Sequence, residues 1–196
     1  MEENQLNSLE KVVIIGGSAG SLEVILRVLP MLNNIDPIVI LLILHRRNSD
    51  DTVLEELLRM KSGLKVEEIE DKTPLKTGRI YVAPADYHLL IEKDMLFSLD
   101  VSEKVNYSRP SIDVGFESAA AVFGSKLVAI LLSGANGDGT KGLIAVKQNH
   151  GIAIIQSPET AEVPYMPAFA LKHITPDHVM TPSEIGSFIK ELVAQS

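Results

Sequence analysis

The stretch VVIIGGSAGS at residues 12–21 decides the fold class, because an apolar run leads straight into a glycine-rich turn. Val12–Ile15 is a continuous β-branched run, which is typical of a strand buried on both faces of a sheet. Ser21–Leu29 then repeats apolar residues at helical spacing, and Pro30 ends the pattern. A strand, a tight turn and a helix in this order predict the opening unit of a parallel α/β sheet.

The same alternation continues along the chain. Further apolar runs predict strands at Ile38–Leu44, Leu127–Leu132 and Ile152–Ile155, with a short strand near His178–Met180. Amphipathic stretches and caps predict helices after Thr52, from Ser111 to Phe123, at Lys141–Asn149 and after the Thr181-Pro182-Ser183-Glu184 capping box. Only the middle differs, where the predicted strands are Arg79–Val82 and a hairpin of His88–Glu92 and Met95–Leu99. We therefore expect a three-layer, doubly wound α/β domain with a mostly parallel sheet and an inserted antiparallel hairpin, spanning residues 11–196 after a short N-terminal arm at 1–10.

Composition limits the function classes. The chain has 196 residues, 45% of them hydrophobic, which is enough for one sizeable core. It has no cysteine, so disulfides, cysteine–zinc sites and cysteine nucleophiles are excluded and a reducing, cytoplasmic location is expected. No apolar run approaches the ~20 residues of a membrane span, and no secretion signal is visible, so we expect no direct membrane insertion. The net charge of -8 argues against nucleic-acid partners.

In open α/β sheets, sites form at the carboxyl ends of the strands. The turn after the first strand lacks the glycine spacing of a dinucleotide site and the Gly-Lys-Ser/Thr ending of a P-loop. It fits G-x-S-x-G, in which Ser18 is an exposed nucleophile on a strand-to-helix turn. An ordinary helix-capping serine is the alternative.

A nucleophilic serine needs a base and an acid nearby. Of the five histidines, only His45 follows a long buried run, and neighbouring parallel strands are ~4.8 Å apart, so it can reach Ser18. Asp138 is the only carboxylate in the glycine-rich turn after Leu127–Leu132. A loop histidine and a turn aspartate are the alternatives for these two residues.

A set of motifs in fixed order carries a family resemblance. They are Gly16-Gly17-Ser18-Ala19-Gly20, His45, Tyr81-Val82-Ala83-Pro84, His88-Leu89-Leu90, Arg109-Pro110-Ser111-Ile112-Asp113, Ser133-Gly134, Gly137-Asp138-Gly139, Glu159, Pro164 and Met166-Pro167. Together they resemble the catalytic domain of the chemotaxis protein-glutamate methylesterases (CheB family) over roughly residues 11–193. The resemblance implies a Ser18–His45–Asp138 triad, oxyanion donors at the backbone of Ala19 and Ala135, and no cofactor or metal. The chain departs from the usual family pattern at Ala19, Ser21, Arg46-Arg47 and Ala135-Asn136.

The resemblance also implies the activity. We expect a serine carboxyl-ester hydrolase that removes methyl groups from γ-glutamyl methyl esters on the cytoplasmic helices of methyl-accepting chemoreceptors, with glutamine deamidation as a second activity. The alternative is a non-catalytic, methylesterase-like binding module in receptor signalling.

Three arginines are candidates for substrate binding. Arg46, Arg47 and Arg109 would form a positive rim that binds carboxylates. The alternatives are a solvated loop for the first two, and for Arg109 a structural contact with Asp113 or the helix start. Family members often carry an N-terminal phosphoreceiver domain, and here only about ten residues precede the first strand. We therefore expect activity without a phosphodonor, with a separate receiver protein as a candidate partner.

Overall fold

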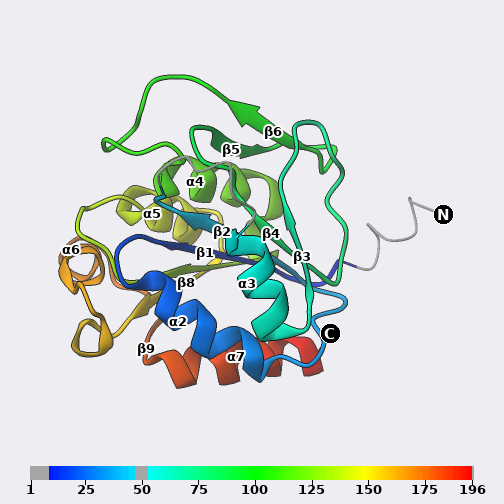
Figure 1. The fold of residues 1–196 in the computed structure, drawn as a ribbon. Helices are drawn as coiled ribbons and strands as arrows, with labels where there is room; N and C mark the ends of the chain where they lie inside the picture. The colour runs from blue at the N-terminus through cyan, green and yellow to red at the C-terminus, as the bar shows by residue number, and fades with distance from the viewer. Residues whose placement is uncertain (1–8, 47–52, 196) are drawn as a thin grey trace.

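A seven-stranded parallel sheet forms the centre of the computed structural model, which describes residues 9–46 and 53–195 (Figure 1). Its strands lie in the order β3-β4-β2-β1-β7-β8-β9, and every neighbouring pair is parallel. Their bounds are β1 Val12–Gly17, β2 Val39–Leu44, β3 Lys65–Glu68, β4 Arg79–Val82, β7 Leu127–Leu131, β8 Ile152–Gln156 and β9 His178–Met180. The order reverses at β1, so the crevice at the carboxyl ends of β2, β1 and β7 is where such folds place their sites.

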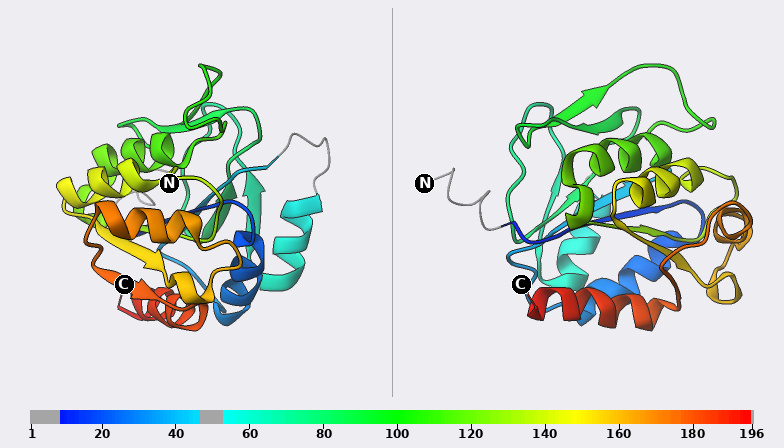
Figure 2. Two further views of the ribbon diagram at one scale, coloured as in Figure 1. Left: turned by 90° about the vertical axis from the view of Figure 1, so that its left-hand side faces the viewer. Right: turned by 180° about the vertical axis from the view of Figure 1, so that it is seen from behind.

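Helices cover both faces of this sheet, as the two further views show (Figure 2). On one face lie α4 (Ile112–Phe123) and α5 (Thr140–Gln148), and on the other lie α2 (Ser21–Val28), α3 (Val53–Ser62) and α7 (Pro182–Ala194). The remaining helix, α6 (Tyr165–His173), contacts α5 and β8. The predicted three-layer, doubly wound class is confirmed.

The two cores follow from the alternation of side chains along each central strand. In β1, Val12 and Ile14 belong to the core beneath α4 and α5, whereas Val13 and Ile15 belong to the core beneath α2 and α7. All six residues of β1 and of β2 are buried, which explains why their sequences are continuous apolar runs. These buried strands hold the carboxyl-end crevice in a fixed position.

The predicted hairpin is also present, as a separate two-stranded sheet. β5 (His88–Ile91) and β6 (Phe97–Asp100) pair antiparallel and pack outside α4 (Figure 1). The segment after β6 runs to α4 on the same side of the molecule as the turn from β1 into α2 (Figure 1). This segment, residues 101–110, is called the rim loop below.

Two elements differ from the prediction. β3 was not predicted, because its sequence KVEE has a single buried side chain, Val66, and no apolar run. α6 was not predicted because Pro164 and Pro167 suggest a loop, although a proline in the first turn of a helix costs no backbone hydrogen bond. Shorter 3₁₀ turns occur at Leu29–Met31, Gly124–Lys126 and Pro158–Thr160.

Both ends of the described chain are tied to the domain. Of the predicted N-terminal arm, Leu9 is buried in the core, and its carbonyl accepts a hydrogen bond from Lys126 Nζ at 2.7 Å. At the other end, α7 begins with the predicted capping box, in which Thr181 and Glu184 bond each other's backbone. The helix predicted after Thr52 begins at Val53, and Thr52 itself lies outside the described residues. None of the described helices combines the length and the apolarity that crossing a bilayer requires.

Candidate active site

Ser18, His45 and Asp138 all lie at the carboxyl ends of three adjacent strands. Ser18 follows β1, His45 follows β2, and Asp138 lies in the loop after β7. Backbone hydrogen bonds continue beyond the strands: the His45 N–H donates to Gly17 O at 3.1 Å, and the Ser18 N–H donates to Ser133 O at 2.9 Å. Ser18 is therefore held between the other two segments, as the sequence predicts.

The imidazole of His45 is fixed by the carboxylate of Asp138. Nε2 of His45 lies 2.8 Å from Asp138 Oδ2, and the two side chains are 11% and 0% exposed. A carboxylate can only accept, so Nε2 carries the proton and Nδ1 presents a lone pair. Nδ1 lies 3.3 Å from the hydroxyl of Ser108 in the rim loop. It is therefore the ring nitrogen available to take a proton from a nucleophile.

Asp138 is held as an anion by a ring of donors. Besides His45, its carboxylate accepts hydrogen bonds from the N–H groups of Ile112 at 2.7 Å and Asp113 at 3.1 Å, and from the Ser111 hydroxyl at 2.9 Å. These backbone donors form the N-terminus of α4, where the helix dipole also favours negative charge. Burial raises the pKa of Asp138, but the hydrogen bonds outweigh it and lower the pKa to about 2.

Asn106 joins Asp138 to a second buried carboxylate. Its Nδ2 donates to Asp138 Oδ1 and to Asp113 Oδ2, both at 2.8 Å. Asp113 also accepts from the Gly142 N–H at 2.8 Å. Burial raises the pKa of Asp113, and the nearby charge of Asp138 adds to this, against the hydrogen bonds from Gly142 and Asn106. Because Asn106 lies in the rim loop, one amide connects that loop to the predicted triad acid.

The turn after β1 leaves Ser18 accessible. Gly20 has a φ of 79°, in the left-handed region that glycine adopts without strain, and it precedes α2. Gly134 allows close approach from the β7 side, because a Cβ there would lie 3.1 Å from the Cβ of Ser18. Ser18 is half-buried, and no hydrogen bond joins its hydroxyl to the rest of the described chain.

The two predicted oxyanion donors are also accessible. Ala19 and Ala135 are exposed, and their backbone N–H groups have no hydrogen-bond partner within residues 9–46 and 53–195. Free N–H groups on either side of a serine can stabilise negative charge on a carbonyl oxygen. Their role as an oxyanion hole stays a prediction.

A cavity of about 370 Å³ opens beside His45, lined mainly by the rim loop. Arg46 and Arg109 both border it. A larger hollow of about 540 Å³ lies along β3 and β4, but none of the three predicted triad residues lines it. Unlike this hollow, the cavity beside His45 is lined by one of the predicted triad residues.

The structure places the three candidate arginines differently. Arg46 forms ion pairs with Glu55, at 3.3 Å, and with Glu68, so the solvated-loop alternative for it is wrong. Arg109 donates from Nη1 to the carbonyls of the rim loop at 2.6 and 2.7 Å. Its side chain thus has a structural contact, as the alternative expected, but with the rim loop, and no hydrogen bond joins it to Asp113 within the described residues. Arg47 lies outside the described residues, and substrate binding by all three stays a prediction.

Sequence reasoning did not assign roles to three residues of this network. Ser111 was predicted as a helix start, which is confirmed, but its hydroxyl also donates to Asp138. Asn106 and Ser108 lie in an irregular loop without periodicity, where no pattern could place them. Among the described residues, no group of three or more His, Asp or Glu side chains is placed to hold a metal ion.

Comparison with known proteins agrees with this geometry. The CheB methylesterase family profile matches residues 13–189. A putative protein-glutamate methylesterase/protein-glutamine glutaminase of Leptospira interrogans is 40% identical over 93% of this chain and 94% of its own length. A protein-glutamate methylesterase/protein-glutamine glutaminase of Thermotoga maritima is 34% identical over 93% of this chain, which spans 54% of that protein.

A solved structure shows the same fold. The crystal structure of the Thermotoga maritima CheB methylesterase catalytic domain superposes with a TM-score of 0.88 at 33% identity, covering 93% of this chain and 98% of the other. The match extends over the whole crevice that holds Ser18, His45 and Asp138. The chain therefore belongs to the CheB methylesterase family.

Proposed function

We propose that the protein is a protein-glutamate methylesterase that uses Ser18, His45 and Asp138 as a catalytic triad. The observation that carries the proposal is the 2.8 Å contact between His45 Nε2 and Asp138, made at the strand end next to Ser18. That contact leaves Nδ1 as the basic nitrogen. The family and the names of the relatives support ester hydrolysis as the reaction.

In the first half of the reaction, His45 Nδ1 removes the proton from the Ser18 hydroxyl as the oxygen attacks the ester carbonyl. The carbonyl oxygen becomes negatively charged, and the N–H groups of Ala19 and Ala135 donate to it. Asp138 holds the imidazole in one orientation and stabilises its charged form. His45 then gives the proton to the departing methoxide, so methanol leaves and Ser18 carries a glutamyl ester.

In the second half, a water molecule takes the place of methanol. His45 removes a proton from the water, the hydroxide attacks the acyl-enzyme, and Ser18 leaves as its protonated hydroxyl. The product is a glutamate carboxylate. The same steps acting on a glutamine side chain release ammonia instead of methanol, which supports deamidation as the second activity, in line with the names of both relatives.

We infer that the substrates are the cytoplasmic helices of methyl-accepting chemoreceptors, as the family resemblance implies. A non-catalytic binding module is not favoured, because a binding module has no need of a buried carboxylate that fixes a histidine beside an accessible serine. A separate receiver protein remains a candidate partner.

The test is methanol release from a helical peptide that carries a γ-glutamyl methyl ester, combined with labelling by a fluorophosphonate, which reacts only with an activated serine. Wild-type protein should release methanol and take up one label. Ser18→Ala should do neither. Ser125→Ala is the matched control, because Ser125 is exposed near the opposite end of β7. Labelling of Ser18→Ala, or methanol release by it, would contradict the proposed mechanism.

A further inference from the structure

The rim loop carries two positive charges that form no ion pair with a described carboxylate, although Asp100 is near enough for Arg109 to contribute, after the hydrogen bonds from Ser102, to the lowering of its pKa. Lys104 and Arg109 both line the cavity beside His45, and neither forms an ion pair with a described residue. Arg46 lines it too, but Glu55 and Glu68 already pair with its guanidinium. The chain as a whole has a net charge of -8, so these two cations form a local positive region on an acidic protein.

Arg109 is held with one edge of its guanidinium unused. Nη1 donates to Val101 O at 2.6 Å and Ser102 O at 2.7 Å, which fixes the group against the rim loop. Nη2 makes no hydrogen bond to a described residue, and Nε is buried without a partner. Because Nε is buried, Nη2 is the nitrogen of this guanidinium that is left to donate to a carboxylate in the cavity, and its charge strengthens that hydrogen bond.

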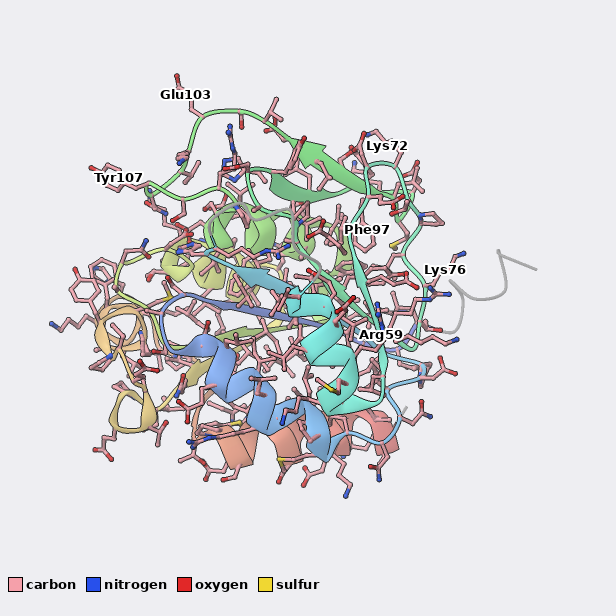
Figure 3. The ribbon with its side chains drawn as sticks, viewed as in Figure 1. Arg59, Lys72, Lys76, Phe97, Glu103 and Tyr107 are labelled. Atoms are coloured by element: carbon pink, nitrogen blue, oxygen red, sulfur yellow. The ribbon has the colours of Figure 1, made fainter. Side chains whose placement is uncertain are left out.

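Among the described residues, the groups that line the cavity carry more positive than negative charge. Asp86 is the one carboxylate in this described lining, and no ion pair joins it to the described cations. Glu103, in the same loop, projects outward from the molecule, as does Tyr107, whose 97% exposed side chain lines the cavity rim (Figure 3). The cavity thus places the cations Lys104 and Arg109 beside the imidazole of His45, with the ring of Tyr107 at its outer rim.

We propose that Lys104 and Arg109 form an anion subsite, which binds a free carboxylate of the polypeptide substrate while a neighbouring methyl ester lies at Ser18. This rests on the proposed function and names what the site recognises beyond the ester itself. Each hydrolysis turns a neutral ester into a carboxylate. The product of one turnover on a helix is therefore a recognition element for the next, and a partly hydrolysed helix is a better substrate than a fully esterified one.

The test compares helical peptides that carry one γ-glutamyl methyl ester and one variable residue, glutamate or glutamine. The variable residue is placed three, four or seven positions before or after the ester, which samples one face of the helix. For at least one placement, kcat/KM for methanol release should be about tenfold higher with glutamate, the size expected for a charged hydrogen bond at a partly exposed site.

Three variants assign the effect to the subsite. Lys104→Gln and Arg109→Lys should each lower the glutamate/glutamine ratio, because the lysine keeps a donor for the two carbonyls but has no second nitrogen in the place of Nη2. Lys93→Gln is the matched control, because Lys93 is an exposed lysine in the β5–β6 turn that forms no ion pair with the described part of the chain. Its ratio should equal that of the wild type.

The outcomes separate the two proposals. A ratio of one at every placement, with normal turnover of both peptides, overturns the anion subsite and leaves the esterase assignment standing. A ratio above one that falls equally in Lys93→Gln shows a long-range effect of net charge and overturns the assignment to Lys104 and Arg109. No methanol release from any peptide overturns the proposed function, and the subsite with it.

Discussion

Replacing Asp138 by asparagine keeps the volume of the side chain and removes its charge. Each of the two carboxylate oxygens accepts hydrogen bonds. Oδ2 accepts from His45 Nε2 and the Ile112 N–H. Oδ1 accepts from the Ser111 hydroxyl and the Asn106 amide. Whichever way the new amide is turned, its NH₂ group faces donors. We therefore expect the imidazole to change its tautomer or its orientation, so that Nδ1 no longer accepts a proton from the nucleophile.

The substitution should have two effects, one on activity and one on stability. Activity should fall by up to ~10⁴-fold, the cost of the same substitution in a known serine-protease triad. The free energy of unfolding should lose the contribution of the ionised Asp138 carboxylate, which depends on pH. The pKa of Asp138 is lowered from 3.8 to about 2 in the folded protein, and each pKa unit corresponds to about 1.4 kcal/mol. The charged carboxylate thus stabilises the native state by about 2 kcal/mol.

The direction with pH follows from the lowered pKa. This stabilisation is fully present above the ordinary pKa of 3.8 and is lost as the pH falls through about 2. Asp113 acts in the opposite sense, because its pKa is raised and its ionisation on increasing pH therefore destabilises the fold. The charge of Asp138 also helps to raise the pKa of Asp113, so the first contribution is measured by comparing Asp113→Asn with the double variant Asp113→Asn/Asp138→Asn, and the second by comparing Asp113→Asn with the wild type.

Urea unfolding followed by far-UV circular dichroism at pH 7, 4 and 2.5 gives the free energies. Between pH 7 and 2.5, Asp113→Asn should lose about 1–2 kcal/mol more than the double variant. Asp94→Asn is the control, because Asp94 is exposed in the β5–β6 turn and makes no hydrogen bond to a described residue, so it should follow the wild type. Parallel pH curves for Asp113→Asn and the double variant, or methyl-ester hydrolysis by Asp138→Asn within tenfold of wild type, would refute the reasoning.

Three further substitutions test other parts of the site. Ser18→Ala should abolish methanol release while changing the free energy of unfolding by less than about 0.5 kcal/mol, since its hydroxyl has no hydrogen-bond partner within residues 9–46 and 53–195; a large loss of stability would contradict this. Arg46→Ala should lower stability by about 1–3 kcal/mol in urea unfolding, because it leaves the buried Glu55 unpaired; unchanged stability with a raised KM would instead favour the predicted substrate rim. Asn106→Ala should lower both kcat and stability, because Asp138 and its neighbouring carboxylate lose their shared donor; a change in KM alone would count against this.

The fold could be predicted where local patterns and tertiary packing agree. β1, β2, β7 and β8 are buried on both faces, so their continuous apolar runs identify them. β3 is an edge strand with one buried side chain and carries no such signal. Its pairing with β4 is decided by the rest of the sheet, which a local pattern cannot show.

The sequence predicts which side chains meet at the ends of the strands, but not which side chains of the irregular loops join them. Register alone brings His45 and Asp138 to one crevice, and their contact confirms that placement. Arg46 shows why neighbours in sequence do not share a function: successive side chains leaving a strand point to opposite sides, so Arg46 turns to Glu55 and Glu68 while His45 turns to Asp138. The donors from the rim loop depend on tertiary contacts with α4, which no spacing in the sequence reveals.

The amide of Asn106 has a consequence for exchanging parts between related enzymes. Its backbone has a φ of 51°, a conformation that asparagine tolerates better than most residues, and its side chain ends on two carboxylates beneath the loop. A chimera that receives residues 101–110 from a relative would import new substrate preferences only if an asparagine occupies the same place. Without this asparagine, Asp138 would lose one of its hydrogen-bond donors, and the graft would change the reaction rate as well as the choice of substrate. Rate and substrate choice therefore cannot be exchanged separately through this loop.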